Sequence, residues 1–198
     1  MTDIIFIGII AGIISTVMMT IFEIPFWKMM GIQGILEWHE NQILVSKILK
    51  KLKRRDHDTV CYTGIFLLHI INGTVAAIVF PYVNLFFTSL FSQNEFSLSI
   101  IFGVAYGILL WTLTLLPIHK PITGLPIWNH PLGKGPAIIS ICGHIIFGIT
   151  LGTITSILLL YKIREARLKK QSDKVNSNKT FKPYAKLTIN INNFIRYF

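Results

Sequence analysis

The stretch PAIISICGHIIFGITLGTITSILLLY, residues 136–161, contains no Lys, Arg, Asp or Glu. A helix of this length can cross about 30 Å of hydrocarbon, because each residue adds about 1.5 Å. Three further stretches, residues 4–22, 60–82 and 98–116, are also uncharged and apolar. Since backbone polar groups in lipid must be satisfied within a segment, the sequence predicts four membrane-spanning helices.

The composition of the chain supports the same conclusion. Of its 198 residues, 52% are hydrophobic and only 14% are charged, which is too apolar for an ordinary soluble domain. The continuous apolar runs exclude a β-barrel, whose strands alternate polar and apolar residues. We therefore predict an all-α, polytopic four-helix bundle, a multi-pass integral protein of the cell membrane.

Two parts of the predicted organisation lie outside the spans. Residues 1–161 are predicted to form the membrane domain, and residues 162–198 a basic, largely disordered C-terminal tail. The segment of residues 42–55, from Gln42 to Arg55, sets apolar residues at helical spacing beside a basic face. This pattern predicts a helix lying along the membrane surface. Residues 117–135 carry several prolines, which predict an irregular, stiff cap with no regular helix.

The net charge of +10 is confined to the segments outside the spans. Residues 23–59 and 117–135, on one face of a four-span protein, hold nine Lys or Arg, and the tail on the other face holds ten, so orientation is undecided. We expect the basic side chains of residues 42–55 and of the tail to contact anionic lipid. A partner subunit or a second copy of the chain is the alternative contact, and no nucleic acid is expected.

Glycines recur at a spacing of four residues inside the predicted spans. The first and third spans share the pattern Gly-x-x-x-Gly, which lets helix backbones approach closely. We therefore expect these two spans to pack against each other through their glycines. The glycines predicted at helix contacts are Gly8, Gly12, Gly103, Gly107, Gly148 and Gly152.

A second repeated pattern places one histidine in the second span and one in the fourth. His69-Ile-Ile-x-Gly73 matches His144-Ile-Ile-x-Gly148, so the chain is predicted to form two tandem helical hairpins. Both histidines lie at similar depth, and ionisable residues inside spans are functional candidates. We predict that they face each other and hold a haem iron, a metal or a shared proton. The alternative is that each is hydrogen-bonded within the core.

Further polar side chains lie in the connections on the face that these histidines approach. Imidazoles and carboxylates in one layer suit zinc, copper or iron, although no standard metal motif is present. The alternative is a set of solvated loop residues. The predicted metal set is Glu37, His39, Glu40, His119 and His130. Glu23, at the end of the first predicted span, needs either headgroup water or a partner.

Several of these motifs together resemble a known type of protein. They are Gly8-x-x-Ala11-Gly12, the region of Gly73, Pro117 ending the third span, and the glycines that follow His144. The chain resembles a group of small prokaryotic integral membrane proteins with four helices and no assigned activity. The resemblance covers residues 4–161 and implies an architecture, with no catalytic residue.

Three functions follow as hypotheses. The first is a binding or accessory membrane subunit, whose basic segments engage lipid or a partner. The second is a redox, metal-binding or haem-binding subunit that uses His69 and His144. The third is a small transporter, disfavoured because the predicted spans contain no acidic residue and no broken pair of helices. No arrangement typical of nucleophilic catalysis is present, so an enzyme is not expected.

Overall fold

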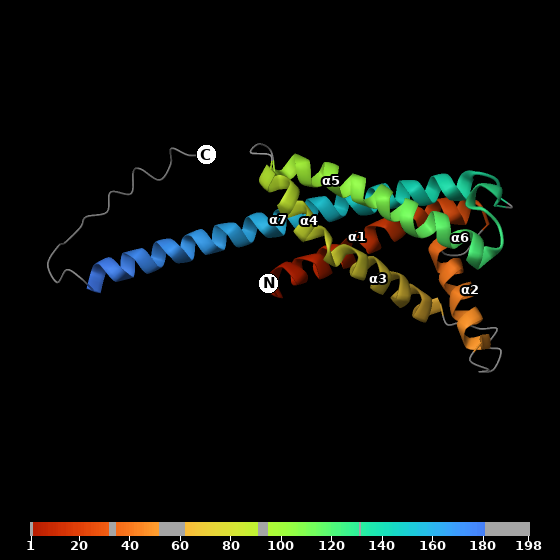
Figure 1. Ribbon diagram of the computed structural model, residues 1–198, viewed down its shortest axis with the longest axis horizontal. Coiled ribbons are helices and arrows are strands. Elements are labelled where there is room, and N and C mark those ends of the chain that lie inside the picture. The colour runs from red at the N-terminus through yellow and green to blue at the C-terminus, as the bar shows by residue number, and fades with distance from the viewer. Residues whose placement is uncertain (1, 32–34, 52–61, 91–94, 131, 181–198) are drawn as a thin grey trace. The chain divides into compact units, whose positions relative to one another are not determined.

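The computed structural model describes residues 2–31, 35–51, 62–90, 95–130 and 132–180. These residues contain helices and no strand (Figure 1). The chain divides into two compact units, Met1–Leu159 and Leu160–Phe198. The elements are α1 (Thr2–Met29), α2 (Leu36–Lys51), α3 (Tyr62–Ile78), α4 (Phe80–Leu90), α5 (Glu95–Leu110), the π-helix η1 (Trp111–Leu115), α6 (Leu116–Thr123), the 3-10 helix η2 (Ile127–Asn129) and α7 (Gly135–Thr180).

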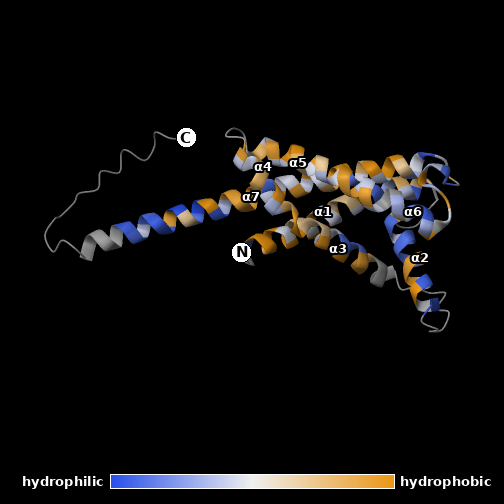
Figure 2. Cartoon of the chain, in the orientation of Figure 1, coloured by the Kyte–Doolittle hydropathy of each residue, from blue (hydrophilic) through white to orange (hydrophobic). Residues whose placement is uncertain are grey.

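Four helical stretches are long and apolar enough to cross a membrane, and their apolar character is visible in Figure 2. They run over Asp3–Met29, Phe66–Leu90, Phe96–Ile122 and Gly135–Lys174. The prediction of an all-α protein with four spanning helices is therefore confirmed.

In the first hairpin, the glycines of α1 pack against α3. A Cβ built on Gly8 would lie 2.8 Å from the Cα of Ile78, and one on Gly12 would lie 2.9 Å from the Cα of Thr74. Real Cβ atoms do not come this close to backbone, so glycine allows the two helices to touch along their backbones.

The second hairpin packs in the same way, with α5 against α7. A Cβ on Gly103 would overlap the carbonyl oxygen of Gly148, and one on Gly107 would overlap that of His144. Gly152 faces the carbonyl oxygen of Ser99 in turn. The expectation that the first and third spans pack together through their glycines is therefore wrong, because each uses its glycines on the next span of its own hairpin.

Prolines change the spans without ending them. Helix α1 continues through Pro25 to Met29, so the first span is longer than the predicted residues 4–22. The second span is interrupted at Val79, between α3 and α4, because Pro81 has no N–H to donate to the carbonyl four residues earlier. It then continues as helix to Leu90, well beyond the predicted end at residue 82.

The proline-rich third connection is more regular than predicted. Residues 116–123 form α6, which contains Pro121, directly after the five-residue π-helix η1. A π turn shifts the backbone hydrogen-bond pattern by one residue. The prolines that follow, which have no N–H to donate, can then be part of a continuing helix. At the end of α6 the Lys47 ammonium donates to the carbonyls of Pro121 at 2.9 Å and Ile122 at 2.8 Å. A basic residue of α2 thus caps α6.

The two basic segments are partly described. Helix α2 includes residues 42–51 of the expected surface helix, and the remaining residues 52–55 lie outside the described residues. Helix α7 continues to Thr180, so residues 162–180 are helical and not disordered as predicted. Lys, Arg, Glu and Gln are good helix formers, which explains why this polar stretch extends the helix. The rest of the tail lies outside the described residues.

Two apolar clusters fill the first compact unit, Met1–Leu159, which is called the membrane unit below. One gathers Trp27, Ile35, Leu36, Trp111, Ile127, Ala137 and Ile139. The other gathers Ala11, Met19, Ala77, Phe80, Phe147 and Leu151. Along α1, Glu23 lies between Met19 and Trp27, one turn from each, and His144 lies between the two clusters along α7. A layer of polar side chains therefore separates the two clusters.

Candidate metal centre

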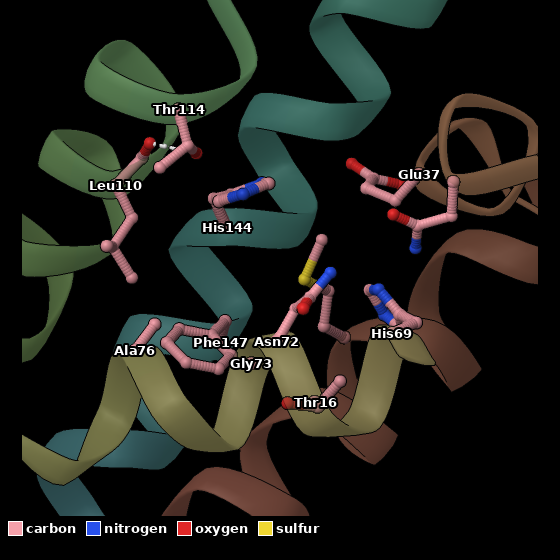
Figure 3. Close-up of a pocket in the computed structure, with 12 residues that line it drawn as sticks. Thr16, Glu37, His69, Asn72, Gly73, Ala76, Leu110, Thr114, His144 and Phe147 are labelled. Carbon is pink, nitrogen blue, oxygen red and sulfur yellow. Dashed lines mark hydrogen bonds between the residues drawn. The ribbon is translucent and has the colours of Figure 1, made fainter. Parts of the chain in front are cut away.

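A cavity of about 320 Å³ lies in this polar layer. Its walls come from all three regions of the membrane unit: the first hairpin, α2 and the second hairpin. Figure 3 shows His144, Glu37 and His69 directed toward one another across it. The lining residues are Thr16, Met19, Glu37, Asn41, His69, Asn72, Gly73, Ala76, Leu110, Thr114, His144 and Phe147.

Glu23 is fully buried beside this cavity, with 0% of its side chain exposed. The indole Nε1–H of Trp27, one turn further along α1, donates to its Oε2 at 3.1 Å. Its Oε1 lies against Gly143 of α7, where a Cβ would overlap it, and the carboxyl group also contacts that of Glu37. Gly143 therefore forms a notch that admits the carboxyl group, and Glu23 lies inside the span, not at the predicted end.

Glu37 enters the same place from the first turn of α2. The Ser140 hydroxyl of α7 donates to its Oε1 at 2.7 Å. Its other oxygen, Oε2, is buried, and the carboxyl group also contacts that of Glu23. Ser140 therefore orients the Glu37 carboxylate and leaves one oxygen to face other groups.

The tautomer of His144 follows from its backbone contact. Its Nδ1 lies 2.9 Å from the carbonyl oxygen of Ser140, one turn earlier in α7. A carbonyl oxygen only accepts hydrogen bonds, so Nδ1 carries a proton and Nε2 is the ring nitrogen left for other contacts. Metal-binding histidines are oriented in this way by a hydrogen bond from their other ring nitrogen.

These three side chains converge. One ligand atom from each of Glu23, Glu37 and His144 lies within 4.8 Å of the other two. Within the described ranges, no other set of three His, Cys, Asp or Glu side chains converges this closely. Two carboxylate oxygens and one imidazole nitrogen form a mixed ligand set suited to zinc, manganese or iron.

His69 lies on the opposite wall of the cavity, on α3. Its side chain is only 6% exposed, and its Nε2 is buried without a hydrogen-bond partner. His69 and His144 thus line one cavity, from the second and fourth spans, as the repeat suggested. The structure adds what the repeat did not indicate, namely that two carboxyl groups from α1 and α2 meet His144 there.

The predicted metal set of the connections divides into two groups. Glu37 belongs to the cavity, whereas Glu40 and His119 contact each other directly through a carboxylate oxygen and Nδ1. The His130 ring lies 6.4 Å from the ring of His119, centroid to centroid. Burial lowers the pKa of His130, and the nearby His39 lowers it further.

The contact within this second group is explained by the protonation of Glu40. Burial and the nearby Glu37 charge raise the pKa of Glu40 to about 9. The carboxyl group is therefore protonated at neutral pH and donates to Nδ1 of His119. A protonated carboxyl that makes this hydrogen bond serves to hold α2 against α6.

Sequence reasoning missed three parts of the centre: the burial of Glu23, the notch at Gly143 and the orienting role of Ser140. Two local patterns mark them, Glu23-x-x-x-Trp27 and Ser140-x-x-Gly143-His144. Both use the helical spacing of three or four residues, which places their members on one helix face.

No known protein family, no curated protein and no solved structure matches the chain. The fold and the site therefore define its class: an all-α protein with four helices long and apolar enough to cross a membrane, and a Glu/Glu/His cluster in which Glu23 is fully buried. The resemblance to small prokaryotic four-helix membrane proteins stays a prediction.

Proposed function

We propose that this chain is a metal-binding protein of the cell membrane that holds one divalent transition metal ion at Glu23, Glu37 and His144. The observation that carries the proposal is the convergence of their ligand atoms within 4.8 Å inside the helical bundle. His69, on the facing wall of the cavity, is the nearest candidate for a fourth ligand.

The pairing of two acids favours a metal over simple packing. The carboxyl groups of Glu23 and Glu37 contact each other, and Nε2 of His69 is buried with no hydrogen-bond partner among the described residues. Buried carboxylates are costly unless a cation balances them, and a divalent ion balances two.

The size of the cavity distinguishes an ion from a haem. About 320 Å³ is at the lower end of ligand-pocket volumes. This space accommodates an ion with a small additional ligand, whereas a haem macrocycle needs more. Of the cofactors considered for His69 and His144, a single metal ion therefore has the best support.

A carrier for the same ion is a second candidate function. The objection to a transporter was the absence of an acidic residue and of broken helices within the spans. Glu23 now lies within the span Asp3–Met29, and the second and third spans are interrupted near Pro81 and at η1. Interrupted helices around a polar site are typical of carriers. Uptake of radioactive zinc or manganese into proteoliposomes would distinguish a carrier from a resident metal site.

The direct test is the metal content of the purified protein. The chain, purified in detergent and loaded with zinc, should retain about one ion after dialysis, measured by inductively coupled plasma mass spectrometry. Cobalt in place of zinc should give visible d–d absorption that reports the ligand geometry. Glu37→Gln and His144→Ala should each lose most of the bound metal.

Glu165→Gln provides the matched control, because Glu165 is an exposed acid on α7 in the other compact unit. Its metal content should equal that of the wild type. A wild-type protein that retains no metal after loading, or a Glu37→Gln variant that retains all of it, would contradict the proposal.

A further inference from the structure

Helices α3 and α5 touch at one level of the membrane unit. The Tyr106 hydroxyl of α5 donates to the carbonyl of Ala76 on α3 at 2.6 Å. The Tyr106 ring also packs on Phe80, with ring centroids 5.3 Å apart. This contact closes the gap between the second and third spans at that level.

One turn closer to the metal centre, the same two helices line the cavity. From Ala76 the wall continues backward along α3 to Asn72 and His69. From Tyr106 it continues forward along α5 to Leu110, and then to Thr114 in η1. Because consecutive spans run antiparallel, both walls extend in the same direction, and the cavity occupies the space between them (Figure 3).

Of the residues that line the cavity, only two are exposed, and they mark where it opens. Asn72 and Thr114, on its two walls, both have exposed side chains, whereas His69 behind them is buried. Both residues lie within spanning helices, so the surface they reach faces the bilayer. An amide exposed to hydrocarbon is costly and rare unless it serves a function. The π turn that carries Thr114 is also of a kind found frequently at functional sites.

We infer that this opening between α3 and η1 admits a neutral lipid amphiphile from the bilayer, headgroup first, whose hydroxyl or carbonyl oxygens reach the metal. The inference rests on the proposed metal site, because the metal supplies the innermost contact. A cavity of about 320 Å³ holds a headgroup or a ring, and the tail remains in the lipid.

The lining of the cavity selects the ligand class. Asn41, Asn72 and Thr114 provide uncharged hydrogen-bonding groups, and Leu110 and Phe147 provide apolar surface. No Lys or Arg is among the described lining residues, so a phosphate headgroup has no cationic side chain to pair with. Hydroxyl and carbonyl oxygens are the headgroup atoms that suit both a metal and these neutral groups.

The test is photo-crosslinking of the full chain in phosphatidylcholine nanodiscs. The probe is a diacylglycerol with a diazirine close to its headgroup, and a phosphatidic acid with the same diazirine is the anionic comparison. We expect diacylglycerol to label α3 and η1, and excess dioleoylglycerol to reduce this labelling at least fivefold. Phosphatidic acid should label these helices only nonspecifically, so an excess of competing lipid should not reduce its labelling.

A variant pair separates the opening from the general lipid surface. Thr114→Trp fills the opening and should lower competable labelling at least fivefold while the bound metal is retained. Leu113→Trp is the control, because Leu113 is exposed on the same π turn but does not line the cavity. Asn72→Leu provides a second, smaller change at the opposite wall and should also lower labelling.

Metal content measured in the same samples distinguishes the two proposals. If the wild type binds metal but labelling is not competable, or falls equally in Leu113→Trp, lateral entry is wrong and the metal site stands. If phosphatidic acid labels competably and diacylglycerol does not, the neutral ligand class is wrong. If the wild type binds no metal, both proposals are overturned.

Discussion

The two hairpins of the membrane unit share their packing and differ in their polarity. Gly8 and Gly12 recur 95 residues later as Gly103 and Gly107, and both pairs bring backbones into contact. At the same offset, however, Thr16 and Glu23 of α1 correspond to Trp111 and Ile118. The first hairpin therefore has a buried acid at a position where the second has Ile118.

This difference separates the residues that stabilise the fold from the residues of the proposed metal site. Each hairpin is held by its own glycines, whereas the proposed metal centre needs Glu23 from the first hairpin, Glu37 from α2 and His144 from the second. Substitutions at glycine contacts should thus alter folding, and substitutions in the polar layer should alter metal affinity at nearly constant stability. The following predictions test that separation.

The largest effect is expected from Gly107→Ala. Its Cβ would overlap the carbonyl oxygen of His144, and backbone cannot rotate away as a side chain can. We expect a loss of about 3 kcal/mol or more, the upper range for overpacking, and a Tm about 10 °C lower in detergent. Ala105→Leu, at an exposed position of the same helix, should leave the Tm unchanged. Equal Tm values for the two variants would show that the glycine contact does not hold the hairpin.

Gly143→Ala should affect metal binding more than stability. The added methyl group would occupy the place of Oε1 of Glu23, so the carboxyl group must move. We expect about a hundredfold lower zinc affinity in competition titrations, the upper range for displaced supporting groups. Gly135→Ala is the matched control on the same helix, because its Cβ meets only the flexible end of Met30. An unchanged zinc affinity in Gly143→Ala would exclude Glu23 from the centre.

Two milder substitutions compare the support that each hairpin gives to the centre. Trp27→Phe removes the indole donor to Glu23, and Ser140→Ala removes the hydroxyl donor to Glu37. Each should lower zinc affinity about tenfold, since each leaves a metal-binding group present but less well oriented. A loss in only one variant would show that a single hairpin supplies the metal site.

The last prediction concerns the pH dependence of stability and the side chain of Glu40, outside the spans. Its pKa is raised from the ordinary 4.5 to about 9, so the folded chain holds a proton that the unfolded chain releases between these values. This contribution to stability is complete at low pH and is lost as the pH rises toward about 9. Glu40→Gln should flatten the dependence of Tm on pH between about 6 and 9. If the Tm of the variant depends on pH as steeply as that of the wild type, another titratable group causes the dependence.

The sequence was sufficient for the four spans, since about twenty uncharged residues in a row have few other structures available. It misplaced their ends because proline and charge were taken as stops. The first span was ended at residue 22 because Glu23 is charged, whereas α1 continues through Pro25 and Glu23 is buried. Similarly, the helical character of α6 depends on the π turn before it and on Lys47 from a distant helix.

The partners of the glycines and the polar residues could not be predicted for a different reason. A glycine pattern indicates that a helix face is approached closely, but it does not specify which helix approaches. Glu37 and Glu40 lie one turn apart on α2, yet one joins the metal centre and the other contacts His119. Such a choice depends on the position of α2 across the ends of the spans, which no local pattern records.

The notch at Gly143 offers a means of finding other proteins of this kind. The Glu23 carboxyl group fits there only because residue 143, directly before His144, is a glycine. We therefore expect related chains to keep or to lose this acid and this glycine together. A search for chains with Glu-x-x-x-Trp late in a first span and Ser-x-x-Gly-His early in a fourth would use this coupling. A chain that keeps the acid but replaces the glycine should have lost the site, whatever its overall similarity.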